Sequence, residues 1–95
     1  MALAEASPDY SQEEVFLPAR AAVLHLVRNG YYDLERSPAA IAEELEVGID
    51  NVREIFSGCF VRGEIDRIPT EDGSSLVITA DGERKLVEIR ERLAA

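Results

Sequence analysis

The sequence predicts a mainly α-helical domain with a small β component, and three patterns along its 95 residues predict this class. Two short segments with the apolar spacing of helices lie within residues 37–62, separated by a Val-Gly-Ile break. Two β-type segments around Glu71-Asp72-Gly73-Ser74 come next and predict a hairpin. Amphipathic segments near 13–29 and 82–94 lie on either side of this central region. One domain of four helices and two strands is therefore expected.

The first helix is expected over residues 13–29, with Pro18 either starting or kinking it. Asn29-Gly30 should end it. Its single histidine, His25, lies beside apolar positions, so we interpret it as a partly buried structural residue rather than a ligand. Residues 1–11 are acidic and lack periodicity, which predicts a disordered arm before a domain at 12–95. The core-facing stripe consists of Ala19, Ala22, Val23, Leu26 and Val27.

The second and third helices are expected over 38–46 and 51–62. Ser37 should cap the second helix, with Pro38 at its first position. Gly48 is free to take the positive φ that ends a helix, and Asp50 should cap the next one. Two helices joined by a tight turn that contains glycine form a helix-turn-helix. The third helix carries its apolar stripe at Val52, Ile55, Phe56, Cys59 and Phe60.

The hairpin is expected near residues 65–79, with strands at 65–69 and 75–79. A last helix over 82–94 presents Leu86, Ile89 and Leu93 on one face. Cys59 falls on a buried stripe, which favours a small core side chain over a redox switch. The residues expected to be buried together are Leu26, Ile41, Leu45, Val52, Ile55, Phe56, Cys59, Ile78 and Leu86.

These elements together resemble the prokaryotic winged-helix regulators. The capped helix, turn and second helix are followed by the exit Arg62-Gly63-Glu64-Ile65-Asp66-Arg67, and Thr79-Ala80-Asp81-Gly82-Glu83-Arg84-Lys85-Leu86 resembles the Thr-x-x-Gly-x-x-x-Leu entry into their last helix. The resemblance covers about residues 19 to 93 and implies a winged helix-turn-helix, with a three-helix core, a two-stranded wing and a C-terminal helix. Such proteins often place a short first strand where Tyr31 to Leu34 lie here. The family implies a DNA-binding transcriptional regulator, although winged helices also serve as protein-binding modules.

Composition narrows the function classes. With one histidine and one cysteine, the chain cannot build a zinc site or a Cys-His pair by itself, and it has no glycine-rich phosphate loop. We therefore expect no enzyme, no metal and no cofactor. No apolar run approaches the ~20 residues that span a membrane, and the N-terminus lacks the regions of a signal peptide. A cytoplasmic protein with no membrane partner is expected.

The exposed side of the third helix carries the candidate DNA contacts. Asn51 and Arg53 lie in its first turn, where helix-turn-helix proteins reach bases. Asn pairs with adenine and Arg with guanine. Ser57 is a further candidate on the same helix, and we expect Arg62 and Arg67 to hold phosphates. Double-stranded DNA is the partner in this interpretation.

Charge favours a second interpretation. The chain carries 19 acidic and 10 basic residues, a net charge of −9, which opposes a polyanion at long range. Residues 37–67 alone carry seven acidic residues and three arginines, and Glu71 and Asp72 lie at the expected wing tip. The alternative is thus an acidic winged-helix protein–protein interaction module that does not bind DNA, with its partner beside Gly58. Acidity that reflects a salt-adapted or high-GC source would keep the DNA interpretation, and both remain open.

The terminal segments suggest association. Leu86, Ile89 and Leu93, together with Val15, Phe16 and Leu17, offer more apolar surface than a small winged helix needs for its own core. A symmetric homodimer through these segments is one expectation. Packing of both segments within one chain is the other.

Overall fold

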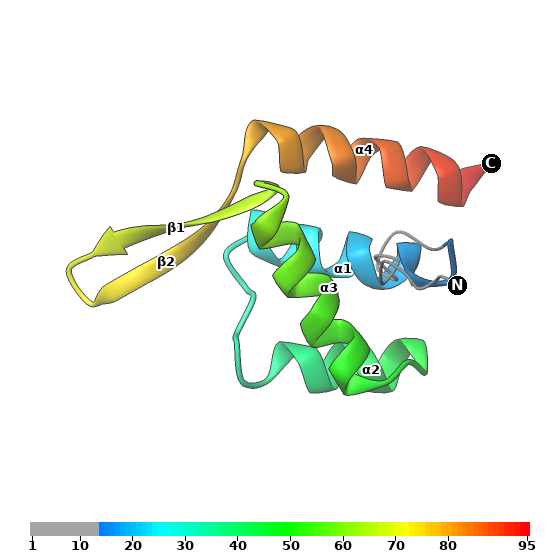
Figure 1. Cartoon of the computed structure of the whole chain (residues 1–95), viewed down its shortest axis with the longest axis horizontal. Coiled ribbons are helices and arrows are strands. Elements are labelled where there is room, and N and C mark those ends of the chain that lie inside the picture. Colours follow the sequence, from blue (N-terminus) through cyan, green and yellow to red (C-terminus); the bar gives the residue numbers. More distant parts are fainter. Residues whose placement is uncertain (1–13) are drawn as a thin grey trace, which may run out of the picture.

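The structure is a computed structural model that describes residues 14–95. It contains helices and one two-stranded antiparallel sheet, so the mainly α class with a small β component is confirmed. The expected arm at 1–11 and the first two residues of the expected domain, 12 and 13, lie outside the described residues. In Figure 1 the hairpin extends away from the helices. The elements are η2 (Glu14–Phe16), α1 (Leu17–Arg28), α2 (Ser37–Leu45), α3 (Ile49–Val61), β1 (Ile65–Thr70), β2 (Gly73–Ile78) and α4 (Ala80–Ala94).

Helix α1 begins at Leu17, directly after the short 3-10 helix η2. Pro18 lies in the first turn of the helix, where a backbone N–H would have no partner within the helix, so its absence in proline costs nothing. The helix ends at Arg28, with Asn29 as its C-cap, and Gly30 follows with a left-handed φ of 75°. The N–H of Tyr31 donates to the carbonyl of Leu26 at 2.8 Å. His25 is exposed, which corrects the prediction of a partly buried histidine. Its Nδ1 lies 2.7 Å from Nη2 of Arg90, so the ring links α1 to α4 instead of entering the core.

The start of α2 differs from the predicted cap. Arg36 is the N-cap residue, and Ser37 is the first residue of the helix. The hydroxyl of Ser37 instead accepts a hydrogen bond from the backbone N–H of Asp33 at 2.8 Å. Asp33 Oδ1 accepts from the N–H groups of Glu35 and Arg36, at 2.8 and 2.9 Å. Asp33 therefore closes the turn that leads into α2. Residues 31–33 form no strand, so the expected first strand is absent from the described sheet.

The turn between α2 and α3 also differs in detail. Its left-handed residue is Glu46, with φ 56° and ψ 43°, and Gly48 has φ −69°. Because α2 ends at Leu45, the reversal of the chain falls on Glu46, two residues before the glycine. Gly48 is the N-cap of α3, the role predicted for Asp50, and α3 begins two residues earlier than expected. Asp50 lies in the first turn of α3, where a negative charge is favourable.

The hairpin is longer at its tip than the sequence indicated. Ile65 pairs with Ile78 at the base, and Thr70 pairs with Gly73 next to a two-residue loop. Ile65 is buried, whereas the rest of β1 is exposed. The tip of the hairpin therefore lies outside the core, whereas its base and the second half of β2 pack against it.

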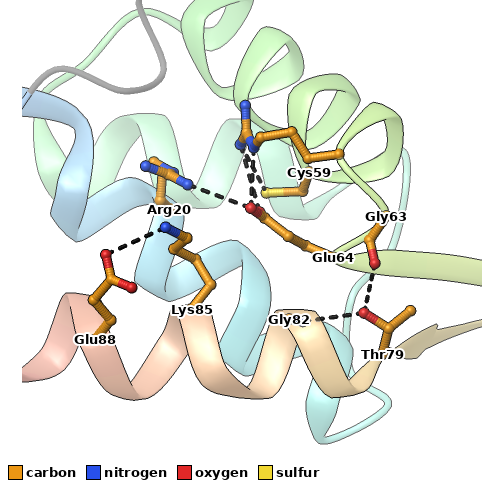
Figure 2. A network of polar contacts seen from close by, with 9 residues as sticks. Arg20, Cys59, Gly63, Glu64, Thr79, Gly82, Lys85 and Glu88 are labelled. Carbon is orange, nitrogen blue, oxygen red and sulfur yellow. Dashed lines mark hydrogen bonds and ion pairs between the residues drawn. The ribbon is translucent and has the colours of Figure 1, made fainter.

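Helix α4 is joined to this base by Thr79 and Gly82 (Figure 2). Thr79 is the N-cap residue, which explains why α4 starts at residue 80 rather than 82. Its Oγ1 accepts from the N–H of Gly82 at 3.0 Å and donates to the carbonyl of Gly63 at 2.6 Å. Its own N–H donates to the carbonyl of Glu64 at 3.0 Å. The predicted Thr-x-x-Gly entry is thus the joint between the hairpin and α4.

The core lies where α1, α3, α4 and the base of the hairpin meet. Val52, Ile55, Cys59, Ile41 and Leu86 are buried as predicted. Leu26, Leu45, Phe56 and Ile78 are only half-buried and pack against this core from its edge. The fully formed core comprises Leu17, Ala19, Val23, Leu24, Val27, Ile41, Val52, Ile55, Cys59, Ile65, Leu86 and Ile89.

Candidate nucleic-acid interface

Helix α3 presents two of the predicted contact residues on one face. Figure 1 shows α3 crossing in front of α1, between α2 and the start of β1. Val52, Ile55 and Cys59 are buried, and Arg53 and Ser57 are exposed. Arg53 and Ser57 are four residues apart and therefore lie on the same face of the helix. The exposed face of α3 thus offers one guanidinium and one hydroxyl close together.

Asn51 lies on a different side of α3. It is exposed, but it precedes Arg53 by two residues and so points about 160° away around the helix axis. Its side-chain Nδ2 lies near Gly48, at the very start of the helix. The structure therefore does not bring Asn51 and Arg53 onto one face, and a duplex would have to meet α3 end-on to reach both.

The guanidinium of Arg53 is held by a neighbour on the same helix. Arg53 Nη1 lies 3.6 Å from Asp50 Oδ1, and their side chains are 59% and 92% exposed. An exposed pair of this kind contributes little energy. Arg53 can therefore leave Asp50 for another acceptor at small cost.

Arg62, the third candidate, has a different environment. Its Nε donates to Glu64 Oε2 at 3.0 Å, and Nη2 contacts Glu64 Oε1 at 3.5 Å and Cys59 Sγ at 3.8 Å. Only 21% of the Arg62 side chain is exposed. The structure thus places Arg62 in an intramolecular ion pair at the end of α3, away from Arg53 and Ser57.

The partner of Arg62 also pairs with a buried arginine that the sequence analysis missed. Glu64 is 4% exposed, and its Oε2 lies 3.6 Å from Nη2 of Arg20 on α1 (Figure 2). Arg20 is 2% exposed. A signal was available, since Arg20 has helical spacing to Val23, Leu24 and Val27 and so falls on the buried stripe of α1. One carboxylate therefore joins α1, the end of α3 and the start of β1.

Cys59 lies directly beside this cluster and is fully buried. Burial, together with the nearby Glu64 carboxylate, raises the pKa of its thiol to about 12. A thiol that stays protonated is a poor nucleophile. This environment agrees with the prediction that Cys59 is a core side chain.

Arg67 is exposed on β1, and no acidic side chain pairs with its guanidinium among the described residues. Its backbone N–H donates to Asp66 Oδ1 at 2.8 Å. The hairpin tip beyond it carries Glu71 and Asp72, both exposed. The hairpin therefore combines one available cation with an acidic tip.

Arg36 is a second available cation that sequence reasoning did not single out. It is exposed at the N-cap of α2, and no ion pair involves its side chain within residues 14–95. The first helix of a helix-turn-helix crosses the DNA backbone. The position of Arg36 at the start of α2 was the sequence signal that could have identified this residue as a phosphate contact.

An aromatic stack connects the segment before α2 to α3. The rings of Tyr32 and Phe56 are 4.9 Å apart and nearly parallel, at 5°. The Tyr32 hydroxyl is buried and has no hydrogen-bond partner among the described residues. Burial is the main reason that the pKa of Tyr32 is raised to about 12. Next to it, the N–H groups of Arg36 and Glu35 hold the pKa of Asp33 below its usual value.

Two further properties concern residues 14–95 as a whole. They contain no group of three or more His, Cys, Asp or Glu side chains placed to bind a metal ion. None of their helices combines the length and apolar character required to cross a bilayer.

Comparison with protein-family models, curated proteins and solved structures finds no match to this chain. A functional assignment must therefore rest on the site itself.

Proposed function

We propose that the chain is a small winged-helix transcriptional regulator that binds double-stranded DNA through α3 and the β1–β2 hairpin. One observation carries the proposal: Arg53 and Ser57 lie together on the exposed face of α3, and the opposite face of this helix is buried. The projecting hairpin next to this helix supports a role as the wing (Figure 1). The proposal carries with it the cytoplasmic location expected from the sequence.

The candidate residues take different roles in this proposal. Arg53 and Ser57 contact base edges in the major groove, and Asn51 contacts the duplex from the start of α3. Arg67 and Arg36 contact phosphates, because no ion pair involves either guanidinium within residues 14–95. Arg62 contributes to the phosphate contacts only if it leaves Glu64.

A binding assay on Arg53→Ala tests the proposal. Duplexes selected from a random pool by the wild type are titrated at low salt, with fluorescence anisotropy as the measurement. Loss of an arginine that grips a guanine should weaken specific binding by about 1–3 kcal/mol. The matched control is Arg84→Ala on α4, an exposed arginine paired to Asp81, which should bind as the wild type does. Equal affinities of all three proteins would overturn the assignment of Arg53.

A protein-interaction module is the second candidate, and the surface charge of the helix pair favours it. Along α2, α3 and the turn between them, the acidic side chains of Glu43, Glu44, Glu46, Asp50 and Glu54 are all exposed. At the end of α3, Phe60 and Val61 are 44% and 83% exposed, and Gly58 is half-buried next to them. In this case the partner is a protein with a basic, partly apolar surface. A wild type without any DNA affinity at low salt would favour this candidate over the first.

A homodimer remains part of the proposal, but with a smaller interface than the sequence suggested. Leu17, Leu86 and Ile89 are buried within one chain, where α1 packs on α4. Val15 and Leu93 are still 66% and 47% exposed near this end. Light scattering at high concentration distinguishes a dimer from a monomer. A solution that contains the 10.5 kDa species alone would exclude the dimer.

A further inference from the structure

A hollow of about 430 Å³ lies between the hairpin and the segment before α2. We call it the hairpin hollow and define it by three apolar side chains, Val27, Tyr32 and Leu76, and three charged ones, Asp33, Glu35 and Arg67. It occupies the place where a third strand was expected and where residues 31–33 instead form none. Its volume falls within the range of about 300–1,000 Å³ that is usual for small-molecule sites.

The apolar part of the hollow is firmly supported. Val27 is 2% exposed, and Tyr32 and Leu76 are half-buried against the core. The Tyr32 ring is fixed by its stack on Phe56. A ligand in the hollow would therefore meet a preformed apolar surface next to an aromatic ring.

The charged part of the hollow is of mixed sign. Arg67 comes from β1, and Asp33 and Glu35 come from the opposite side, yet no ion pair joins Arg67 to either carboxylate. Asp33 makes its hydrogen bonds through Oδ1, which leaves Oδ2 without one among the described residues. Glu35 makes no side-chain hydrogen bond within residues 14–95. Opposite charges thus border one hollow, and no ion pair within residues 14–95 joins its two sides.

We propose that the hairpin hollow binds a small zwitterion with an apolar body, of the aromatic or branched amino-acid class. Its carboxylate pairs with Arg67, its ammonium group with Asp33 and Glu35, and its side chain packs on Tyr32 and Leu76. A guanidinium suits a carboxylate because it can donate two parallel hydrogen bonds. A larger ligand with one sign of charge would leave at least one of the charged sides unmatched.

Such a ligand would act on the proposed DNA interface, a consequence that rests on the proposed function. It would occupy Arg67, one of the phosphate contacts, and would contact Tyr32, which stacks on α3. The ligand should then weaken DNA binding, and by reciprocity DNA should weaken ligand binding by the same factor.

Amide chemical-shift titrations of the full chain test the site without DNA, so their result is separate from that of the DNA-binding assay. The probe is L-phenylalanine, with phenethylamine and hydrocinnamate as analogues that lack its carboxylate or its ammonium group. Saturable shifts are expected at residues 30–35 and 67–76 with L-phenylalanine, and weaker ones with each analogue.

Arg67→Gln should weaken L-phenylalanine binding about tenfold or more and leave phenethylamine binding unchanged, because only the former has a carboxylate to lose. The control is Arg84→Gln on α4, an exposed arginine that pairs with Asp81 outside the hollow, and this variant should bind L-phenylalanine as the wild type does. The spectra themselves show whether each variant is folded. Absence of saturable shifts in the wild type, or equal L-phenylalanine affinity in Arg67→Gln, would overturn the proposal.

Discussion

At Gly82 the first turn of α4 lies close against the backbone at the base of the hairpin. A Cβ at this position would lie 2.0 Å from the carbonyl oxygen of Glu64 and 2.7 Å from Cγ1 of Ile78. The carbonyl belongs to the backbone, so it cannot turn aside as a flexible side chain would. Only glycine therefore lets the first turn of α4 lie directly on the chain that leads into the hairpin.

We predict that Gly82→Ala lowers the free energy of unfolding by about 2–4 kcal/mol, since a methyl group forced against backbone displaces α4. Urea denaturation at neutral pH measures the effect. The matched control is Gly48→Ala, where φ is −69° and the new Cβ meets only the side chain of Asn51 at 3.3 Å. The control should cost less than about 1 kcal/mol. Equal stability of the two variants would contradict the close contact.

Tyr32 gives a prediction about alkaline pH. Its pKa is raised from 10.0 to about 12, so the folded state holds the phenol proton more tightly than the unfolded state does. The stabilisation is present below pH 10 and is lost as the pH rises from 10 to 12. Tyr32→Phe should therefore change stability little at neutral pH and make its decline between pH 10 and 12 less steep. Tyr31→Phe is the control, because the Tyr31 side chain is 74% exposed, and it should leave the alkaline decline as in the wild type.

At the scale of elements, sequence patterns predicted α1 to α4 and the strands β1 and β2 to within a few residues. The apolar stripes place these elements because burial of one face decides where a helix can form. The turns were harder, because capping depends on contacts that spacing does not reveal. Asp33, rather than Ser37, closes the turn before α2, and Glu46, rather than Gly48, takes the left-handed conformation. The candidate site was predicted only in part, because residue spacing does not reveal that Glu64 pairs with Arg62.

The turn before α2 should respond to acid through Asp33. Its pKa is lowered from 3.8, so the charged carboxylate favours the folded state. The stabilisation is present above pH 3.8 and is lost as the pH falls through the lowered pKa. Asp33→Ala should thus be less stable than the wild type at neutral pH, and the difference should shrink in strong acid. Urea midpoints across this range measure it, with Glu35→Ala as the control; a difference that persists unchanged in acid would contradict the role of the carboxylate.

The ion cluster at the end of α3 gives the second prediction at this scale. Glu64→Gln removes the charge that pairs with Arg20 and Arg62, and an arginine 2% exposed is then left with one carboxylate fewer. Breaking a buried pair in this way should destabilise the fold by about 3 kcal/mol or more. Glu88→Gln removes a carboxylate from the exposed pair with Lys85 and should cost less than about 1 kcal/mol. Similar urea midpoints for both variants would show that the buried ion cluster does not stabilise the contact between α1, the end of α3 and the start of β1.

At the scale of the whole molecule, the distribution of cations matters more than their number. The chain has ten basic and nineteen acidic residues. The basic residues on α4 all have partners within the described residues. Arg36, Arg53 and Arg67 are the exposed cations nearest the proposed interface. The cations of α4 contact Asp81 (Arg84), Glu88 (Lys85), His25 (Arg90) and Glu14 (Arg92). A duplex at α3 would therefore be held by few phosphate contacts.

The acidic tip of the hairpin should weaken binding without selecting a sequence. Replacing Glu71 and Asp72 by Lys should strengthen binding to any duplex, because tip charge acts on phosphates and not on bases. Anisotropy titrations with a selected duplex and a scrambled one measure both affinities. Their ratio should stay as in the wild type. An increase confined to the selected duplex would show that the tip reads sequence.

The salt dependence of DNA binding tests the central proposal most directly. Each phosphate neutralised contributes about 0.9 to the slope of log affinity against log salt concentration. With so few available cations, the slope per protomer should be shallow, on the order of two or three, and lower by about one in Arg67→Gln. Measurable binding at low salt with this slope would support a winged helix that contacts DNA through α3 and the hairpin. No affinity for any duplex at the lowest salt concentration, or a slope unchanged in Arg67→Gln, would contradict it.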